Sequence, residues 1–368
     1  MQLYITFMMK LNRKLNTAPF IAAFMLIIFC SIDGKSQQKN DEMNIGEMIQ
    51  PLTNEGIFRD PDFYNWGNSI IKDEDNKYHL FYSRWPREYG FFAWLTHSEI
   101  AHAIADQPEG PYQYKETVIQ GRGGNYWDAI TAHNPKIKYF EGMYYLYYIG
   151  THSNEKYISP EELIETANIG YSHSNWSILR NNQRTGVAVA GSIHGPWKRF
   201  DSPIVEPEGP ITTLTVNPAI TRGPEGKYYL IVKGDKPNET RFIRNQAIAT
   251  AHTPVGPFTI ESKPVIDYLD TEDVSMWFSE SNTRFYAVFH AHTFIGLITS
   301  EDGFNWKKAD NYKVTDKKIL KNDGTFIEPD RMERPFVFIE NGSPRVFSLA
   351  IKKGDDSYSV FISLKKND

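Results

Sequence analysis

The chain has 368 residues, of which 40% are hydrophobic, 14% aromatic and 23% charged, and its formal net charge is −5. This composition excludes a disordered protein, and the mildly acidic balance argues against nucleic acid as a partner, since a phosphate-binding surface normally requires a basic face. The single cysteine excludes an internal disulfide bond and a cysteine-based zinc cluster.

The N-terminal stretch has the form of a secretory leader. Basic residues precede an apolar run from Phe20 to Cys30, and a polar segment follows. Eleven apolar residues are too few to span a bilayer, so we expect cleavage near Ser36 and no stable membrane span. The expected location is periplasmic or extracellular, with a surface lipoprotein anchored through Cys30 as the alternative. The predicted regions are a leader at 1–36, an N-terminal tail or linker at 37–56 and one folded domain at 57–368.

A strand–turn–strand pattern recurs five times along that domain. Its clearest copy runs through 131–137, turns at Glu141-Gly142 and returns through the aromatic strand 143–148. A small-residue strand and a glycine–aromatic turn, such as Gly110-Pro111-Tyr112, follow four of the copies. Five such units predict an all-β fold, a five-bladed β-propeller of four-stranded antiparallel blades. The fifth unit is shorter, so closure of the ring requires an outer strand from residues before Asn68.

The segment 152–182 interrupts the second unit. It contains Glu161-Glu162-Leu163-Ile164-Glu165, which predicts one or two helical turns. Long insertions between blade strands commonly shape a binding site, so we expect this one to flank the site, with a solvated connector as the alternative.

In a propeller, the residues just before the innermost strands converge on the central axis. These positions hold Trp66 and Asn68, then Trp127 and Asp128 with His133 and Asn134, then Asn217, then Glu272 and Asp273, and finally Glu333 and Arg334. A concave polar pocket with carboxylates is the default site. Two opposed carboxylates are what cleavage of a glycosidic bond needs, one protonated and one ionised. Trp66 and Trp127 would offer stacking faces to sugar rings, with blade packing as the alternative.

The blade pattern, the Gly-Pro-aromatic turns and Glu272 before the fourth inner strand resemble the five-bladed propeller glycoside hydrolases of family 43 and the related family 117. The resemblance covers about residues 57–365. It implies hydrolysis of plant or algal sugar polymers, with Glu272 as the general acid. Two aspartates complete the site in family 43, but Asn68 and Asn217 occupy those positions here, and an amide cannot accept a proton as a carboxylate does.

The second carboxylate must therefore come from elsewhere, and the candidates are Asp128 and Glu333. We favour Asp128, because Trp127 and His133 give it a hydrogen-bonding environment. The remaining residues are expected to bind substrate or tune pKa values: Trp66, Asn68, Trp127, His133, Asn134, Asn217, Asp273 and Arg334. Arg334 would either hold a carboxylate ionised or bind an anionic sugar through its planar fork.

These expectations define an exported glycoside hydrolase that removes terminal units from an oligosaccharide or polysaccharide, including an anionic one, without a cofactor. A structural cation in the central channel remains an alternative, as does a pair of metal-binding histidines, His290 and His292. Two other functions stay open: a non-catalytic carbohydrate-binding propeller, and a metal-dependent lyase, which would need three converging histidines. The oligomeric state is open, with a homodimer as one alternative.

Overall fold

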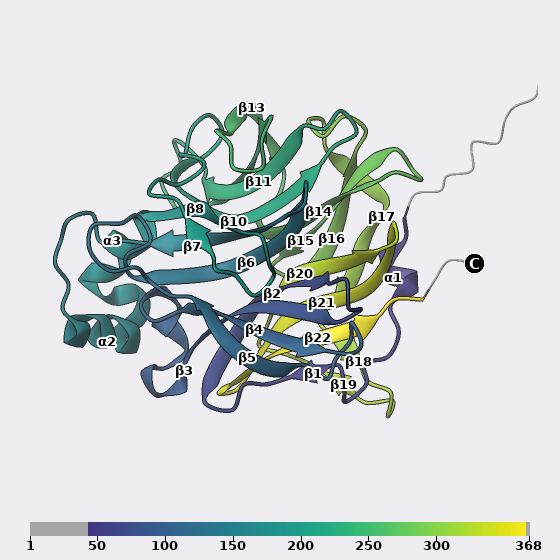
Figure 1. Cartoon of the computed structure of the whole chain (residues 1–368), viewed down its shortest axis with the longest axis horizontal. Coiled ribbons are helices and arrows are strands. Elements are labelled where there is room, and N and C mark those ends of the chain that lie inside the picture. Colours follow the sequence, from purple (N-terminus) through teal and green to yellow (C-terminus); the bar gives the residue numbers. More distant parts are fainter. Residues whose placement is uncertain (1–42, 366–368) are drawn as a thin grey trace, which may run out of the picture. The chain divides into compact units, whose positions relative to one another are not determined.

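The computed structural model describes residues 43–365, which form five four-stranded antiparallel sheets arranged as a five-bladed propeller (Figure 1). The predicted fold class is thus confirmed. The predicted leader, Cys30 and the first part of the predicted linker lie outside the described residues. Within those residues, no helix combines the length and the apolar character needed to cross a membrane.

Four blades follow the chain in order. Blade I consists of β2 (Phe63–Lys72), β3 (Tyr78–Pro86), β4 (Glu99–Ala105) and β5 (Gln113–Ile119). Blade II consists of β6 (Thr131–Phe140), β7 (Met143–Thr151), β8 (Gln183–Ala190) and β9 (Lys198–Arg199). Blade III consists of β10 (Thr212–Arg222), β11 (Tyr228–Asp235), β12 (Arg244–Ala251) and β13 (Thr259–Ile266). Blade IV consists of β14 (Thr271–Ser279), β15 (Arg284–Ala291), β16 (Phe294–Ser300) and β17 (Lys307–Asp316).

Blade V joins the two ends of the domain. Its strands are β20 (Arg331–Glu340), β21 (Ser343–Lys353), β22 (Asp356–Ser363) and, from the other end of the chain, β1 (Ile57–Phe58). Ile57 pairs with Val360 in antiparallel register. This confirms that the outer strand comes from residues before Asn68. Because β1 pairs with β22, the N-terminal end of the domain completes the fifth blade and closes the ring.

Apolar clusters fill the spaces between neighbouring blades. Between blades III and IV, for example, Ile231 and Ile248 pack with Phe285 and Phe289. Other clusters join blades I and II, II and III, IV and V, and V and I. Each sheet therefore buries both faces only through its neighbours, as the repeat pattern predicts.

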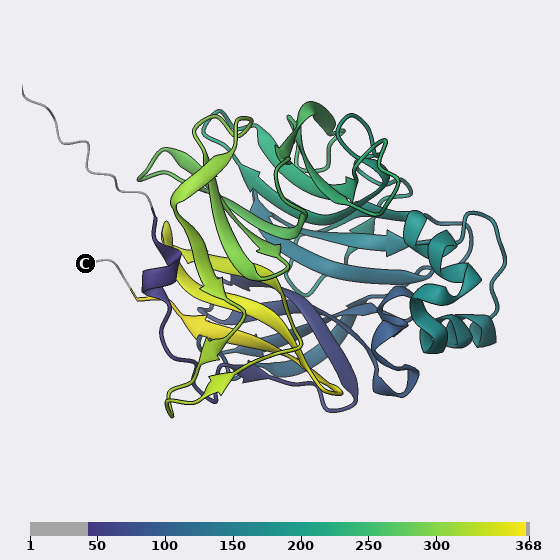
Figure 2. The same ribbon diagram turned by 180° about the vertical axis from the view of Figure 1, so that it is seen from behind.

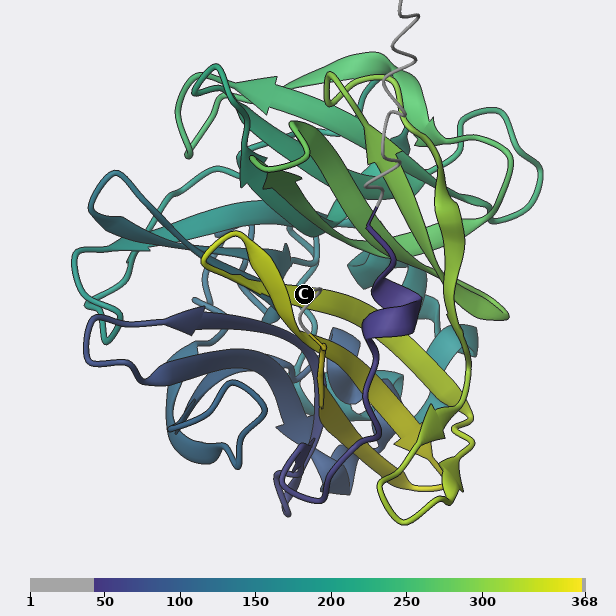
Figure 3. The same cartoon turned by 90° about the vertical axis from the view of Figure 1, so that its right-hand side faces the viewer.

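The segment before β1 packs on the propeller as well. Ile45 and Met48 of helix α1 (Ile45–Met48), together with Leu52, are buried in the cluster between blades IV and V. Helix α1 lies beside β17 (Figure 3). The short pair β18 (Ile319–Leu320) and β19 (Phe326–Ile327) is linked to this segment through a bridge between Leu52 and Lys321.

The insertion in blade II forms helices α2 (Pro160–Ile169) and α3 (Ser174–Asn181), which confirms the predicted helical turns. A capping box begins α2, because Ser159 Oγ accepts from Glu162 N at 3.2 Å and the Glu162 carboxylate accepts from Ser159 N at 2.8 Å. Both helices lie at the end of the propeller opposite α1 (Figure 2). Trp176 and Leu179 of α3 pack with Leu95 of blade I, so the insertion is anchored across two blades.

Candidate active site

The innermost strands share one irregularity near their N-terminal ends. Each contains a β-bulge, and one residue within each bulge has a positive φ angle. These residues are Gly67 (51°), Asn134 (49°), Asn217 (57°), Asp273 (63°) and Arg334 (55°). The residue just before each of them points to the same cavity, and these are Trp66, His133, Val216, Glu272 and Glu333. Five equivalent bulges thus aim five side chains at one site.

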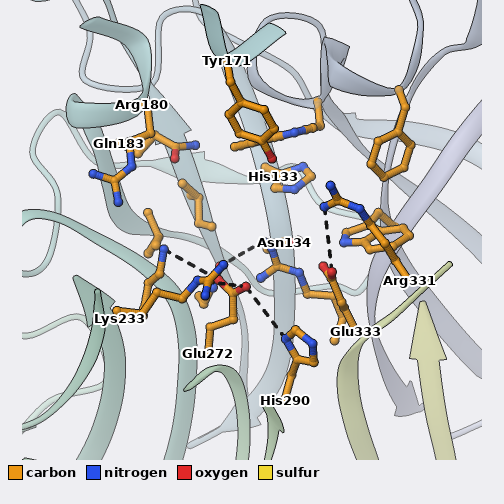
Figure 4. Close-up of a pocket in the computed structure, with 18 of the residues that line it drawn as sticks. His133, Asn134, Tyr171, Arg180, Gln183, Lys233, Glu272, His290, Arg331 and Glu333 are labelled. Atoms are coloured by element: carbon orange, nitrogen blue, oxygen red, sulfur yellow. Dashed lines mark hydrogen bonds and ion pairs between the residues drawn. The ribbon is translucent and has the colours of Figure 1, made fainter. Parts of the chain in front are cut away.

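The cavity has a volume of about 670 Å³ (Figure 4). One side carries the aromatic residues Trp66, Trp85, Phe91, Trp94, Tyr171 and Trp176. Among the described residues, six lysines and arginines line it against three carboxylates: Arg180, Lys233, Arg244, Lys317, Arg331 and Arg334 against Glu272, Asp330 and Glu333. Tyr171, Trp176 and Arg180 belong to the insertion, so the insertion lines this cavity, as expected for a segment that flanks the candidate site. The lining thus combines stacking surfaces with more basic than acidic side chains.

A hydrogen-bonded ring lies behind this cavity. Asn134 Nδ2 donates to Asn217 Oδ1 at 3.0 Å, and Asn217 Nδ2 donates to Asp273 Oδ1 at 2.8 Å. The Arg334 guanidinium donates to the same Asp273 oxygen, and its Nη1 lies 2.8 Å from the Asn134 amide nitrogen, a contact between two donors that is not a hydrogen bond. The fifth blade position is Gly67, where a Cβ would meet Asn134 Oδ1 at 2.6 Å. The ring therefore has four side chains and one glycine that makes room for them.

Glu272 is surrounded by positive charge. Its carboxylate lies 3.2 Å from Arg244 Nε and 3.7 Å from Lys233 Nζ (Figure 4). Burial alone would raise the pKa of Glu272, but the charges of Lys233 and Arg244 outweigh burial and hold it well below its usual range. Glu272 is thus ionised across the whole physiological pH range.

Glu333 enters the same cavity from the neighbouring blade (Figure 4). Its cationic partner Arg331 is more distant, at 3.8 Å, and is 39% exposed. Burial raises the pKa of Glu333 to about 7, and the negative charges of Glu272 and Asp273 act in the same direction. Near neutral pH a large share of Glu333 therefore carries a proton.

Two histidines border the carboxylates. His133 is buried between Trp85 and Trp94, its Nδ1 lies 2.7 Å from Ser98 Oγ, and burial holds its pKa well below the usual value. His133 is therefore neutral. His290 Nε2 accepts from Lys317 Nζ at 2.7 Å, while its Nδ1 lies 3.8 Å from both Glu272 and Asp273.

The cluster of Glu272, Asp273 and His290 is the one place in the described central channel where three potential metal-ligand atoms lie within 4.8 Å of one another. Protein cations already occupy its surroundings, however. Lys233 and Arg244 contact Glu272, and Arg334 pairs with Asp273. A divalent ion would be repelled by these cations, so the cluster does not fit the structural cation considered from the sequence. His292, the other candidate ligand, is exposed and contacts Asp270 at 3.4 Å.

The structure corrects the expectation for Asp128 and Trp127, neither of which lines the cavity. Asp128 is fully buried, accepts from Tyr148 at 2.6 Å and is ion-paired with Arg122 at 2.5 Å and Arg199 at 3.3 Å. Both of its oxygens are therefore engaged within blade II and its neighbourhood, away from any substrate. Trp127 packs on Gly186, where a Cβ would lie 2.2 Å from its ring.

Asn68 lies one residue beyond the ring position, because Gly67 takes the register that we had assigned to Asn68. It is buried, its Oδ1 accepts from Ser348 Oγ at 2.5 Å, and it does not line the main cavity. Asn134, Asn217 and Arg334 border the cavity, whereas Asp273 lies behind it in the ring. Asn68 is thus a structural residue in this fold.

Several cavity residues lie outside the predicted set, notably Lys233, Arg244 and Lys317. Lys233 sits opposite Val216 in the strand pair β10–β11, so it reaches the axis from a second strand. Its sequence signal was a lysine at the end of the apolar run 228–232. Arg244 is the first residue of β12, and Lys317 directly follows β17. No local sequence pattern marks either residue as lying near the axis.

The fold is similar to that of solved five-bladed propeller glycoside hydrolases. No family model matches the sequence, and no curated protein matches it significantly. Several solved structures are similar to this chain. Zg3597, a family 117 glycoside hydrolase of the marine bacterium Zobellia galactanivorans, is similar with a TM-score of 0.59 and 16% identity over 86% of this chain and 90% of that chain.

Two further structures extend the likeness. An endo-arabinase from Bacteroides thetaiotaomicron has a TM-score of 0.53 and 11% identity, with 87% of this chain and 99% of that chain covered. An alpha-L-arabinofuranosidase from Lactobacillus brevis has a TM-score of 0.54 and 14% identity, with 89% and 95% covered. At these identities the likeness shows a shared fold.

Proposed function

We propose that this protein is an exported glycoside hydrolase that releases terminal sugar units from an anionic oligosaccharide or polysaccharide. One observation carries the proposal: Glu272 and Glu333 line a single cavity, where their surroundings shift their pKa values in opposite directions. Glycosidic bond cleavage needs such a pair, one acid that protonates the leaving oxygen and one carboxylate that acts on the anomeric carbon or on a water molecule. The fold shared with known glycoside hydrolases supports this activity.

The electrostatics support roles that differ from those expected from the sequence. Glu333, with its pKa raised to about 7 by burial and by nearby negative charge, serves as the general acid. Glu272, held ionised by Lys233 and Arg244, serves as the base or nucleophile. The sequence-based expectation gave the acid role to Glu272, because that residue matches the acid position of family 43.

The closed inner end of the cavity favours a chain end as substrate. Asn134, Asn217, Asp273 and Arg334 hydrogen-bond across the axis and block passage of a polymer through it. Trp94 and Tyr171 stand on the aromatic side, where a terminal sugar ring can stack. The substrate therefore enters from the side of α2 and α3 and presents its terminal unit to the carboxylates.

The excess of cations favours a negatively charged sugar. Arg180 is paired with Asp235, Lys233 with Glu272, and Arg244 with both Glu272 and Asp270. Lys317 and Arg331 have weaker compensation: Lys317 Nζ donates to neutral His290, and Arg331 lies 3.8 Å from Glu333. A uronate or sulfate group would supply the missing negative charge. Export, proposed from the basic and apolar stretch before residue 36, would give access to such polymers outside the cytoplasm.

A carbohydrate-binding propeller without catalysis is the second candidate. It is favoured by Asn217, an amide in the inner ring where family 43 has an aspartate. The same stacking wall and cations would then bind a sugar chain end without cleaving it. The two candidates differ in one measurable respect, namely whether sugar is released.

The test uses a panel of neutral, uronate-containing and sulfated oligosaccharides labelled at the reducing end. We expect the wild-type chain to release a terminal unit from an anionic member, and the double variant Glu272→Gln/Glu333→Gln to bind the same compound without cleaving it. The matched control is Glu208→Gln, a glutamate outside the cavity, which should cleave normally. Binding by the wild-type chain with no release from any anionic or neutral compound would refute the hydrolase and leave the binding protein.

A further inference from the structure

A second cluster of ionisable side chains lies at the boundary of blades I and II, and none of its members lines the cavity. It contains His79 of β3, His102 of β4, Glu116 of β5 and His194, which lies in the turn between β8 and β9. The ring centroids of His79 and His102 are 5.0 Å apart, and His194 lies 5.8 Å from His102. Three histidines from two blades therefore converge away from the proposed catalytic groups.

A chain of hydrogen bonds fixes the proton positions in this cluster. The Asp73 carboxylate accepts from Lys77 N at 2.8 Å and lies 2.8 Å from His79 Nε2, which must therefore carry a proton. His79 Nδ1 is then a bare acceptor, and it lies 2.8 Å from His102 Nε2, which donates to it. This relay leaves the lone pair of His102 Nδ1 without a proton.

That lone pair faces a second acceptor. His102 Nδ1 lies 3.5 Å from Glu116 Oε1, so two hydrogen-bond acceptors face each other with no proton between them. An imidazole nitrogen that carries no proton is the form that binds a metal ion. Two ligand atoms about 2.1 Å from a tetrahedral zinc ion lie about 3.4 Å apart. The observed separation thus matches one edge of a zinc site.

The third ligand comes from the neighbouring blade. Ligand atoms of His102, Glu116 and His194 all lie within 4.8 Å of one another. We propose that these three side chains bind one divalent transition-metal ion, with Zn²⁺ as the best fit, and that water completes a tetrahedral site. Two nitrogens and one carboxylate oxygen form a donor set that suits zinc.

The surroundings of the cluster support a built site. His102 is fully buried, and Phe81 stacks on its ring at a centroid distance of 4.7 Å. Asp73 and His79 orient it from behind, in the way that carboxylates orient metal-bound histidines in known zinc sites. His194 is exposed and the Glu116 side chain is half-buried, so an ion can enter from solvent. Because the ligands come from blades I and II, the ion would clamp these two blades together.

The test measures Zn²⁺ binding to the untagged chain after chelator treatment, by calorimetry and by thermal unfolding. We expect one ion per chain and a higher Tm in its presence. His194→Ala and Glu116→Gln should each weaken binding by at least about tenfold, and Asp73→Asn by about 10- to 100-fold through loss of orientation. Substitution of Co²⁺ should give the visible absorption of a four-coordinate ion.

Two controls make the result specific. His252→Ala removes an exposed histidine near the corresponding Gly256-Pro257 turn of blade III, and it should bind Zn²⁺ like the wild-type chain. Glu272→Gln alters the central cluster and should leave Zn²⁺ binding intact. The proposal is overturned if the wild-type chain binds no Zn²⁺, if His194→Ala and Glu116→Gln bind it with unchanged affinity, or if Glu272→Gln abolishes binding.

Discussion

Glu272 and Glu333 have nearly the same exposure, 14% and 15% of their side chains, yet their pKa values are shifted in opposite directions. The difference lies in their neighbours. Glu272 has two buried or half-buried cations, Lys233 and Arg244, whereas the partner of Glu333 is the exposed Arg331. The charges of the neighbouring side chains therefore determine which carboxylate keeps its proton.

The first prediction concerns the pH dependence of activity. Because Glu333 must be protonated to act as the acid and its pKa is raised to about 7, kcat/KM should fall as the pH rises through about 7. Removal of a positive neighbour raises this pKa further, so Arg331→Gln should move the alkaline midpoint upward by about one pH unit. Arg59→Gln, at the exposed pair with Asp356, should leave it unchanged. If Arg331→Gln leaves the midpoint unchanged, deprotonation of Glu333 is not the cause of the activity loss at alkaline pH.

The second prediction concerns stability against pH. The folded pKa of Glu333 is raised from 4.5 to about 7, so the stability linked to its proton is present below pH 4.5 and is lost as the pH rises through about 7. At pH 8, Glu333→Gln should therefore raise the free energy of unfolding, by a few kcal/mol at most. Glu272→Gln should lower it at the same pH, since Lys233 and Arg244 lose their counterion. Urea unfolding at pH 5 and pH 8 measures both effects, and an equal response of the two variants would contradict the assignment.

The third prediction separates structure from catalysis at Asp128. Asp128→Asn leaves Arg122 and Arg199 without their buried counterion and should destabilise the fold by about 3–5 kcal/mol. Asp201 also pairs with Arg122, at 3.0 Å, but its side chain is 81% exposed, so Asp201→Asn should cost less than about 1 kcal/mol. Under conditions where Asp128→Asn is folded, its kcat/KM should equal that of the wild-type chain. A large loss of kcat with an unchanged Tm would restore a catalytic role for Asp128.

The blade count, the closure through β1 and the helices of the insertion were all predictable from the sequence. Strand alternation and the glycine turns are local features that recur, and five copies define the ring. The same recurrence identified the axial positions of Glu272, Glu333, His133 and Asn134. In blade I the predicted axial position was wrong by one residue. There Gly67 has the left-handed conformation that asparagine, aspartate or arginine adopts in the other blades.

The partners of the carboxylates were not predictable in the same way. Asp128 meets Arg199 across 71 positions of sequence, and Glu272 meets Lys233 from another blade. Such pairs depend on how blades pack, and no periodicity in the chain encodes them. The roles that we propose for Glu272 and Glu333 differ from the sequence-based expectation for this reason, since pKa values depend on charges that only the fold brings together.

The fourth prediction tests the inner ring. Gly67→Ala forces a Cβ to within 2.6 Å of Asn134 Oδ1 at a φ of 51°, so it must displace the Asn134 amide. Gly142→Ala has a similar conformational penalty, at a φ of 81°, but meets nothing within 4 Å. We expect Gly142→Ala to cost about 1 kcal/mol and Gly67→Ala to cost about 1–2 kcal/mol more. The added cost should disappear when Asn134→Ala is also present, in a double-mutant cycle of unfolding free energies. Equal costs for the two glycines would show that Asn134 does not restrict Gly67.

The most direct measurement compares Glu333→Gln and Glu272→Gln on two substrates of the same sugar: the natural oligosaccharide and an aryl glycoside whose leaving group needs no protonation. We expect Glu333→Gln to lose about 10²- to 10⁴-fold in kcat/KM on the oligosaccharide but to retain most of its activity on the aryl glycoside. Glu272→Gln should lose activity on both. If Glu272→Gln alone keeps the aryl glycoside activity, the roles are reversed, and if neither variant loses activity, catalysis does not take place at this pair.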